Sequence, residues 1–210
     1  MNLNTIVIKV ASRCNLNCSY CYMYNLGDNT YRNQPKIMSY DTVELLLSRV
    51  LEYSKNLNLK FIQFVFHGGE PLLAKKEWYL NFVNRSKIIL SNINSRFLMQ
   101  TNGVLYDEEW CSFLNSLNIH IGFSWDGPKN IHDNFRVFHN KKGSYDEVVK
   151  GMKIHKNKHN NLSGLSVINA EVSPKDYYNN IKELGITHSS LLLPHFHYSM
   201  KDEFHKFNYS

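Results

Sequence analysis

Residues 4–22 read NTIVIKVASRCNLNCSYCY, and this stretch decides which fold to expect. Its first part is β-branched and apolar, a composition typical of a buried parallel strand. Cys14, Cys18 and Cys21 then stand close together in the loop that follows. A disulfide framework is improbable in a chain of this size that shows no secretion signal, so the clustered thiols predict a metal site.

Strand-like and helix-like segments alternate along the rest of the chain. Strands are expected at Asn4–Val10, Lys60–Phe66, Arg96–Gln100, Ile119–Ser124, Gly164–Asn169 and Ile186–Leu193. Helices are expected at Tyr40–Lys55, Lys75–Ser91, Asp107–Ser116, Ser144–Lys158 and Lys175–Leu184, and a polar loop at Lys129–Gly143. Repeated βα units with short connections predict an α/β protein with parallel strands and helices outside. Either an open doubly wound sheet or an incomplete barrel fits this order.

Distinctive residues gather where the predicted strands end. GGEP (residues 68–71) follows the second strand, TNG (residues 101–103) the third, and Ser124 and Asp126 the fourth. Parallel α/β folds bind their ligands at this edge of the sheet, so a site is expected there. Asp126 itself, next to Gly127, is expected to be an ordinary turn residue.

Composition and charge exclude several classes of protein. The 210 residues are 43% hydrophobic and 20% charged, enough for one domain with a full core and too few for two large ones. No apolar run is long enough to span a membrane, and the N-terminus lacks a secretion signal, so a cytoplasmic protein is expected. The net charge of +6 comes from scattered lysines without a basic cluster, so nucleic acid is not an expected partner.

The cysteine spacing discriminates between two kinds of metal site. A structural zinc ion takes four ligands, usually from two paired knuckles, and no second knuckle accompanies Cys14, Cys18 and Cys21. Cys111, flanked by Trp110 on a predicted helix, is expected to be a buried apolar thiol. An iron–sulfur cubane held by three thiolates keeps one iron open to bind and reduce a small chelating ligand. The spacing therefore favours an iron–sulfur cluster over zinc.

Five segments together resemble one known family. CNLNCSYC (residues 14–21) resembles the signature of the radical S-adenosylmethionine (SAM) superfamily, in which an aromatic residue precedes the third cysteine. GGEP (residues 68–71) resembles its glycine-rich segment, and residues 100–103 and 124–128 resemble the strand ends that follow. HDNFR (residues 132–136) is similar to a His-Asp-x-x-Arg segment of its peptide-modifying members. The order of these segments along the chain makes a chance match improbable.

The resemblance implies a partial (β/α)6 barrel that carries one [4Fe–4S] cluster and SAM at its top. Cys14, Cys18 and Cys21 would ligate the cluster, and the fourth iron would bind the methionine part of SAM. One electron from the reduced cluster would cleave SAM to methionine and a 5′-deoxyadenosyl radical, which abstracts a hydrogen atom from the substrate.

The resemblance also implies a set of residues that contact SAM. Glu70 and the glycines before it would hold the methionine ammonium, and Arg136 would bind the carboxylate end. The backbone next to Tyr20 would lie against the adenine of SAM, and the Leu192 side chain would form one side of the adenine pocket. The complete set is Tyr20, Gly68, Gly69, Glu70, Asn102, Ser124, Arg136 and Leu192. No residue is assigned a catalytic role.

The combined pattern is closest to maturases of peptides and proteins that carry a cysteine-rich C-terminal (SPASM) domain. These include ribosomal-peptide maturases, among them a cyclophane-forming type that joins an aromatic ring to a β-carbon, and anaerobic sulfatase maturases. Residues 23–28 and 143–146 are among the short stretches that favour the cyclophane-forming type. The partners implied are a precursor peptide or protein and a reductant such as flavodoxin or ferredoxin.

One departure from the family pattern leaves other hypotheses open. No cysteine follows Cys111, and the chain stops at Ser210 soon after the last predicted strand. Residues 1–210 are therefore expected to form one radical SAM core domain, truncated after the sixth strand and without the SPASM domain. An inactive remnant that retains only cluster or peptide binding is one alternative. A nucleic-acid-modifying radical enzyme is another, which the pI of about 9.0 favours and the lack of a basic cluster disfavours.

Overall fold

One sheet of six parallel strands organises the chain, and the strands follow one another in sequence order. The computed structural model describes residues 3–169 and 172–194. The strands are β1 (Thr5–Ala11), β2 (Phe61–Gly68), β3 (Asn94–Thr101), β4 (Ile119–Ser124), β5 (Ser163–Val167) and β6 (His188–Leu192). A doubly wound sheet reverses its strand order near the middle, so the sequential order selects the partial barrel of the two expected architectures.

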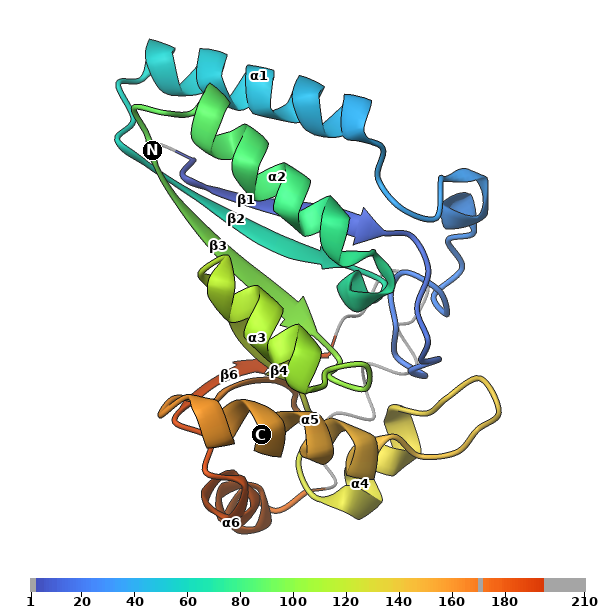
Figure 1. The fold of residues 1–210 in the computed structure, drawn as a ribbon. Coiled ribbons are helices and arrows are strands. Elements are labelled where there is room, and N and C mark those ends of the chain that lie inside the picture. Colours follow the sequence, from blue (N-terminus) through green and yellow to red (C-terminus); the bar gives the residue numbers. More distant parts are fainter. Residues whose placement is uncertain (1–2, 170–171, 195–210) are drawn as a thin grey trace.

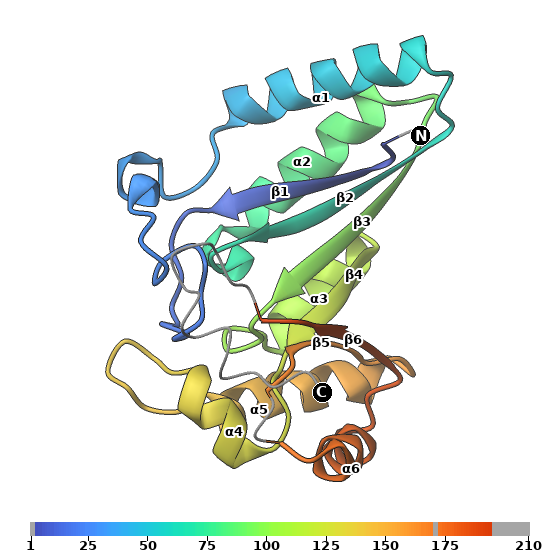
Figure 2. The same ribbon diagram turned by 180° about the vertical axis from the view of Figure 1, so that it is seen from behind.

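Helices cover the outer face of this sheet (Figures 1 and 2). They are α1 (Tyr40–Asn56), α2 (Lys76–Ile89), α3 (Glu108–Ser116), α5 (Tyr145–Lys158) and α6 (Pro174–Leu184). The short helix α4 (Lys129–Phe135) packs against α5, and two 3-10 helices, η1 (Thr30–Asn33) and η2 (Pro71–Leu73), lie in connections between the strands and helices. Within the described residues β1 and β6 have one strand neighbour each, so the barrel is open between them. The arrowheads of β1, β2 and β3 point toward the side that carries the loop after β1 (Figure 1).

The hydrophobic core lies between the outer face of the sheet and the helices. Ile62, Phe64 and Phe66 of β2 are fully buried there, whereas the residues between them are half-buried because they face the inside of the barrel. Phe82 of α2 packs edge to face against both phenylalanines, at centroid distances of 5.2 and 5.1 Å. On β1, Val7 is 60% exposed while Ile8 and Val10 are buried, so this strand is buried on one face and not on both as its composition predicts.

Local sequence sets the ends of several helices. The side chains of Ser39, Asp107 and Ser173 accept backbone N–H hydrogen bonds in the first turns of α1, α3 and α6. Gly185 ends α6 in the left-handed conformation, with φ of +68°. Across the part of the chain that the structure describes, none of the helices has the length and apolar character needed to traverse a lipid bilayer.

Helix α4 corrects the expectation that Lys129–Gly143 is a continuous polar loop. This helix cannot be recognised from the sequence pattern, because the helix is short and has no apolar stripe. Tertiary contacts stabilise it instead. Ile131 and His132 are buried, and Asp133 accepts a hydrogen bond from the Tyr145 N–H at 2.8 Å.

Candidate functional site

The cysteine loop, residues 12–24, begins where β1 ends and lies along the segment that follows α4. The Asn17 N–H donates to the Val137 carbonyl at 2.7 Å, and an antiparallel bridge pairs Leu16 with Phe138. The segment after α4 therefore supports the loop that carries Cys14, Cys18 and Cys21, although more than a hundred residues separate the two in the sequence.

The three thiols of this loop are free and half-buried. The Cys14 sulfur accepts hydrogen bonds from the Leu16 N–H at 3.4 Å and from Asn102 Nδ2 at 3.8 Å. Burial raises the pKa of Cys14 to about 12 and also raises the pKa of Cys18, while the Arg136 guanidinium acts in the opposite direction on both. Burial thus disfavours the thiolate form of Cys14 and Cys18, which is the form that ligates metals, and a bound cation would favour it.

Gly68 and Gly69 let the end of β2 pack directly against the cysteine loop. Gly68 has φ of +129°, and a Cβ there would collide with the Ala11 backbone. A Cβ on Gly69 would collide with the Arg13 carbonyl and the Tyr24 hydroxyl. The glycine pair is thus explained by a close approach between two segments that also meet at the predicted cofactor site.

Glu70 is a fully buried carboxylate that fastens the end of β2 to the end of β3. Its Oε1 accepts hydrogen bonds from the Leu72 N–H at 2.8 Å and the Thr101 hydroxyl at 2.7 Å. Its Oε2 accepts one from the Asn102 N–H at 2.8 Å. Burial raises the pKa of Glu70, and the three hydrogen bonds lower it. A carboxylate has about four lone-pair sites, so Glu70 can accept a further donor.

Tyr20, Asp126 and Arg136 form a polar cluster beside the cysteine loop. The Tyr20 hydroxyl donates to Asp126 and accepts from Arg136 Nη1 at 2.8 Å, and Arg136 lies 3.8 Å from the same carboxylate oxygen. Asp126 is not an ordinary turn residue, because it is buried and also accepts from the Val167 N–H of β5 at 3.1 Å. Arg136 Nε is buried and has no partner among the described residues, so this guanidinium has a donor left for a ligand.

His132 lies behind this cluster and fixes its backbone. Its Nδ1 accepts from the Asp126 N–H at 3.3 Å, and its Nε2 lies 3.1 Å from the Ser144 hydroxyl, which donates to the Arg136 carbonyl at 2.7 Å. Burial lowers the pKa of His132 to about 2, so the ring stays neutral. The HDNFR stretch therefore combines a positioning histidine with the arginine that it holds in place.

The other expected SAM contacts lie around the same edge of the sheet. Asn102 is buried just after β3, and Ser124 at the end of β4 accepts a hydrogen bond from Gln100 Nε2 at 2.9 Å. Leu192 of β6 is 46% exposed and pairs with Val167, the residue whose N–H binds Asp126. Sequence reasoning missed Asp126 as a member of the site. Its place just past the end of β4 drew attention to it, but the neighbouring glycine favoured the interpretation as a turn residue.

The donor set fits an iron–sulfur cluster better than a zinc ion. Among the described residues, the three loop thiols do not form a group of ligand atoms compact enough to surround one ion, whereas Cys111, His155 and His159 do. The thiolates of a cubane bind separate irons, so they stand farther apart than the ligands of a single ion. Cys111 is buried as expected, but it faces two histidines and not only apolar side chains.

Comparison with known families defines the class of protein. The model of the Radical SAM superfamily matches residues 8–184, and the chain therefore belongs to that superfamily. Its members are enzymes of radical chemistry whose cofactors are a [4Fe–4S] cluster and SAM. The family that the cysteine loop and strand ends resemble is thus confirmed.

Particular relatives place the chain near one type of maturase. It is 33% identical over 174 residues to a cysteine-type anaerobic sulfatase-maturating enzyme of Clostridium novyi (strain NT), covering 82% of this chain and 45% of that enzyme. It is 34% identical over 186 residues to a serine-type enzyme of Bacteroides thetaiotaomicron, covering 87% and 44%. The solved structure of native anSMEcpe with bound AdoMet superposes with a TM-score of 0.80 at 26% identity, covering 96% and 56%. This chain thus spans about half the length of the curated relatives.

Proposed function

We propose that this chain is the cofactor-binding core of a radical SAM enzyme that abstracts a hydrogen atom from a peptide or protein. One observation carries the proposal. Three half-buried thiols lie beside a buried Arg136 whose Nε has no partner in the described structure, at the carboxyl ends of parallel strands. When bound, the reduced cluster supplies the electron that cleaves SAM to methionine and a 5′-deoxyadenosyl radical.

The proposed division of labour follows from the contacts of each side chain. Cys14, Cys18 and Cys21 ligate the cluster. Arg136 donates its free Nε–H to the SAM carboxylate, and Glu70 accepts from the SAM ammonium with a remaining lone pair. The two residues thereby offer opposite charges to the two charged groups of the methionine part.

The remaining contacts are proposed to hold the nucleoside part and to shape the pocket. Tyr20 is tied to Arg136 and Asp126, so its neighbouring backbone has a fixed place to meet the adenine. Ser124 is proposed to contact the ribose. Leu192, at the same edge of the sheet, is proposed to form one side of the adenine pocket. Gly68, Gly69 and Asn102 are proposed to complete the part of the site that holds the methionine group of SAM, where the glycines let backbone segments approach closely.

The substrate class is proposed from the relatives. Curated relatives are named as cysteine-type and serine-type sulfatase-maturating enzymes. The structure of anSMEcpe with bound AdoMet and Cp18Cys peptide also superposes, with a TM-score of 0.76 at 26% identity. We therefore propose a peptide whose reacting residue is cysteine or serine. The cyclophane-forming type stays a prediction from short stretches, without support from these relatives.

The first test asks whether the chain cleaves SAM. The chain is reconstituted with iron and sulfide without oxygen, reduced with dithionite and mixed with SAM, and 5′-deoxyadenosine is quantified by chromatography. We expect product from the parent chain and none from the Cys14→Ala, Cys18→Ala, Cys21→Ala triple variant. An exposed residue supplies the matched control: Arg49→Lys should retain full product formation, because Arg49 lies on the surface, where it pairs with Glu52. A cluster-loaded parent that forms no product would refute SAM cleavage by this chain and leave the hypothesis of an inactive remnant.

The second test addresses the substrate. Peptides carrying a cysteine or serine deuterated at Cβ are added, together with a peptide in which an aromatic residue lies near a Cβ-deuterated residue. Deuterium in 5′-deoxyadenosine identifies the peptide from which hydrogen is abstracted. Transfer from the cysteine or serine peptide supports the proposed class, and transfer from the aromatic peptide alone supports the cyclophane-forming type.

A further inference from the structure

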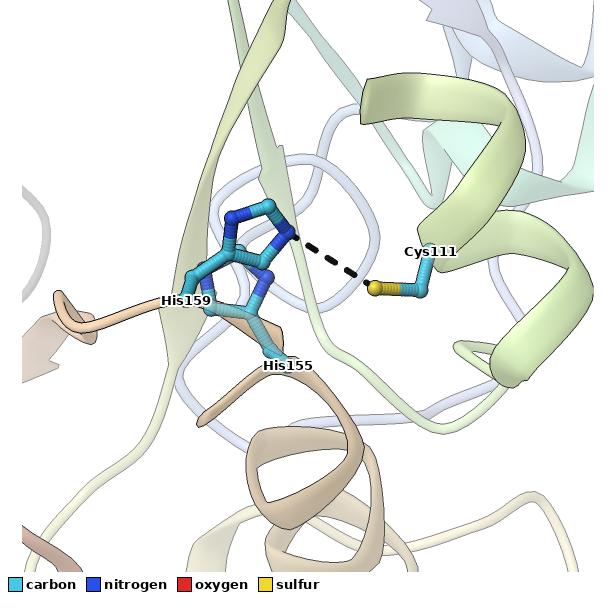
Figure 3. Close-up of side chains that lie close together, drawn as sticks. All are labelled: Cys111, His155 and His159. Carbon is cyan, nitrogen blue, oxygen red and sulfur yellow. Dashed lines mark hydrogen bonds between the residues drawn. The ribbon is translucent and has the colours of Figure 1, made fainter. Parts of the chain in front are cut away.

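A second group of metal-binding side chains lies outside the cofactor site, between α3 and the end of α5. Cys111 on α3 is 1% exposed, His155 on α5 is 6% exposed, and His159 directly after α5 is half-buried. Figure 3 shows the three side chains converging, with the two imidazoles stacked. His155 and His159 are four residues apart, a spacing that places them on one side of a helix.

The distances match those around one small metal ion. The Cys111 sulfur and one ring nitrogen from each histidine all lie within 4.8 Å of one another. Cys111 Sγ is 3.8 Å from His159 Nε2, and the two rings have centroids 4.4 Å apart. Sulfur and nitrogen ligands of a tetrahedral zinc ion, bound at about 2.3 and 2.0 Å, stand roughly 3.5 Å apart. Small side-chain rotations therefore suffice to enclose an ion.

We propose that Cys111, His155 and His159 bind a divalent transition-metal ion, with zinc as the best match. One thiolate and two imidazoles are ligands of the borderline type that zinc prefers over the hard oxygen ligands of magnesium or calcium. Three protein ligands leave a fourth position for water. The ion would join α3 to α5, the helices that flank β4, and would thereby stabilise the outer layer of the barrel.

The surroundings of His155 support this assignment. The Tyr106 hydroxyl lies 3.0 Å from His155 Nδ1. Metal-bound histidines are typically oriented by such contacts of the second ring nitrogen.

A metal ion could reach Cys111, His155 and His159 through a neighbouring cavity. A cavity of about 500 Å³ is lined by all three ligands and also by His120 and His188. The contacts also fit a simpler arrangement, in which the Cys111 thiol and His159 share a weak hydrogen bond without a metal. Metal-binding measurements on matched variants separate the two arrangements.

The test uses Co²⁺ as a spectroscopic substitute for Zn²⁺. The variant in which Cys14, Cys18 and Cys21 are alanine is titrated with Co²⁺ in the absence of oxygen. In this variant the three thiols of the cysteine loop cannot compete for the Co²⁺ ion. We expect one Co²⁺ per chain, tetrahedral ligand-field bands and a thiolate-to-cobalt charge-transfer band, all displaced by Zn²⁺. Zn²⁺ should also raise the midpoint of thermal unfolding.

Two ligand variants and one neighbour complete the design. His159→Gln should weaken Co²⁺ binding at least tenfold, and Cys111→Ser should remove the thiolate band. His188→Gln, which alters the same cavity without removing a ligand, should bind as the parent does. Absence of Co²⁺ binding, or equal affinity in parent and His159→Gln, would overturn the proposal. Should the triple variant not fold, the cluster-loaded parent provides the answer, because one zinc per chain beyond the iron must then disappear in His159→Gln.

Discussion

Arg136 joins several parts of the cofactor site through one side chain. It is 8% exposed, it contacts Tyr20 and Asp126, and its Nε has no partner in the described residues. Burial acts against its charge, but Tyr20, Cys18 and Asp126 outweigh this effect and raise the pKa of Arg136. A guanidinium can bind a carboxylate through two parallel hydrogen bonds, which an ammonium cannot. The shape of this cation therefore matters as well as its charge.

Arg136→Lys is expected to weaken SAM binding about tenfold or more, which corresponds to about 1.4 kcal/mol. The positive charge stays, but the planar donor pair is lost. Equilibrium binding of SAM to the cluster-loaded chain measures the effect. Arg49→Lys, on the surface, serves as the control and should bind SAM as the parent does. Equal affinities in all three chains would contradict the role of Arg136.

Glu70→Gln is expected to lower the free energy of unfolding by about 1–3 kcal/mol, because an amide NH2 replaces one of two acceptor oxygens in a fully buried site. One of the donors from Leu72, Thr101 or Asn102 then faces another donor. Urea unfolding of the chain without cofactors measures the change. The partly exposed Glu44, paired with Arg85, gives the comparison, and Glu44→Gln should change stability by less than about 1 kcal/mol. A similar loss of unfolding free energy in both variants would show that the buried hydrogen bonds of Glu70 stabilise the chain no more than a surface ion pair does.

At the scale of elements, the cysteine loop depends on its two neighbours, the end of β2 and the segment after α4. Gly69 lies so close to the Arg13 carbonyl and the Tyr24 hydroxyl that no Cβ fits between them. Asn17 and Val137 join the loop to the segment after α4 from the other side. The loop therefore keeps its conformation only if both neighbours keep theirs.

Gly69→Ala is expected to displace the cysteine loop and to reduce cluster loading severalfold, because backbone atoms must move to admit the methyl group. Iron and sulfide content after reconstitution measures the effect. Gly27→Ala is the control: Gly27 has φ of +94° but open space around it, so the change strains the backbone without a collision. Full cluster loading in Gly69→Ala would mean that the close approach is not needed.

The elements themselves differ in how far the sequence predicts them. The alternating order of strands and long helices is recovered because buried strands and amphipathic helices impose periodic patterns on their own residues. Helix α4 is missed because its stability comes from buried contacts of Ile131 and His132 with other segments. The exposed inner face of β1 is missed for a similar reason, since an open barrel edge is not encoded in the strand's own composition.

At the scale of the whole molecule, His132 links folding stability to pH. An unfolded histidine titrates near pH 6.5, while burial lowers the pKa of His132 in the folded chain to about 2. Between these values the unfolded chain binds more protons, so the free energy of unfolding decreases as the pH falls below about 6.5. His155, whose pKa burial lowers to about 4, contributes with the same sign.

The unfolding free energy of the cofactor-free chain is expected to decrease by up to about 1.4 kcal/mol per pH unit from His132 alone as the pH falls from about 6 to 4. His132→Asn should show a shallower dependence, even if it is less stable at neutral pH. Urea unfolding at several pH values gives both slopes. His188→Asn, at an exposed position on β6, should retain the slope of the parent. Identical slopes for the parent and His132→Asn would contradict this linkage.

The sequence by itself determined the order of the βα units, the clustered cysteines and the glycine-rich strand end. Each of these features depends on local periodicity or on residue types whose chemistry is recognisable in isolation. Only the tertiary structure decided that Asp126 and Arg136 meet Tyr20, that the segment after α4 supports the cysteine loop, and that Cys111 faces His155 and His159. Those contacts join residues far apart in the chain, and a local pattern carries no information about which distant side chains burial brings together.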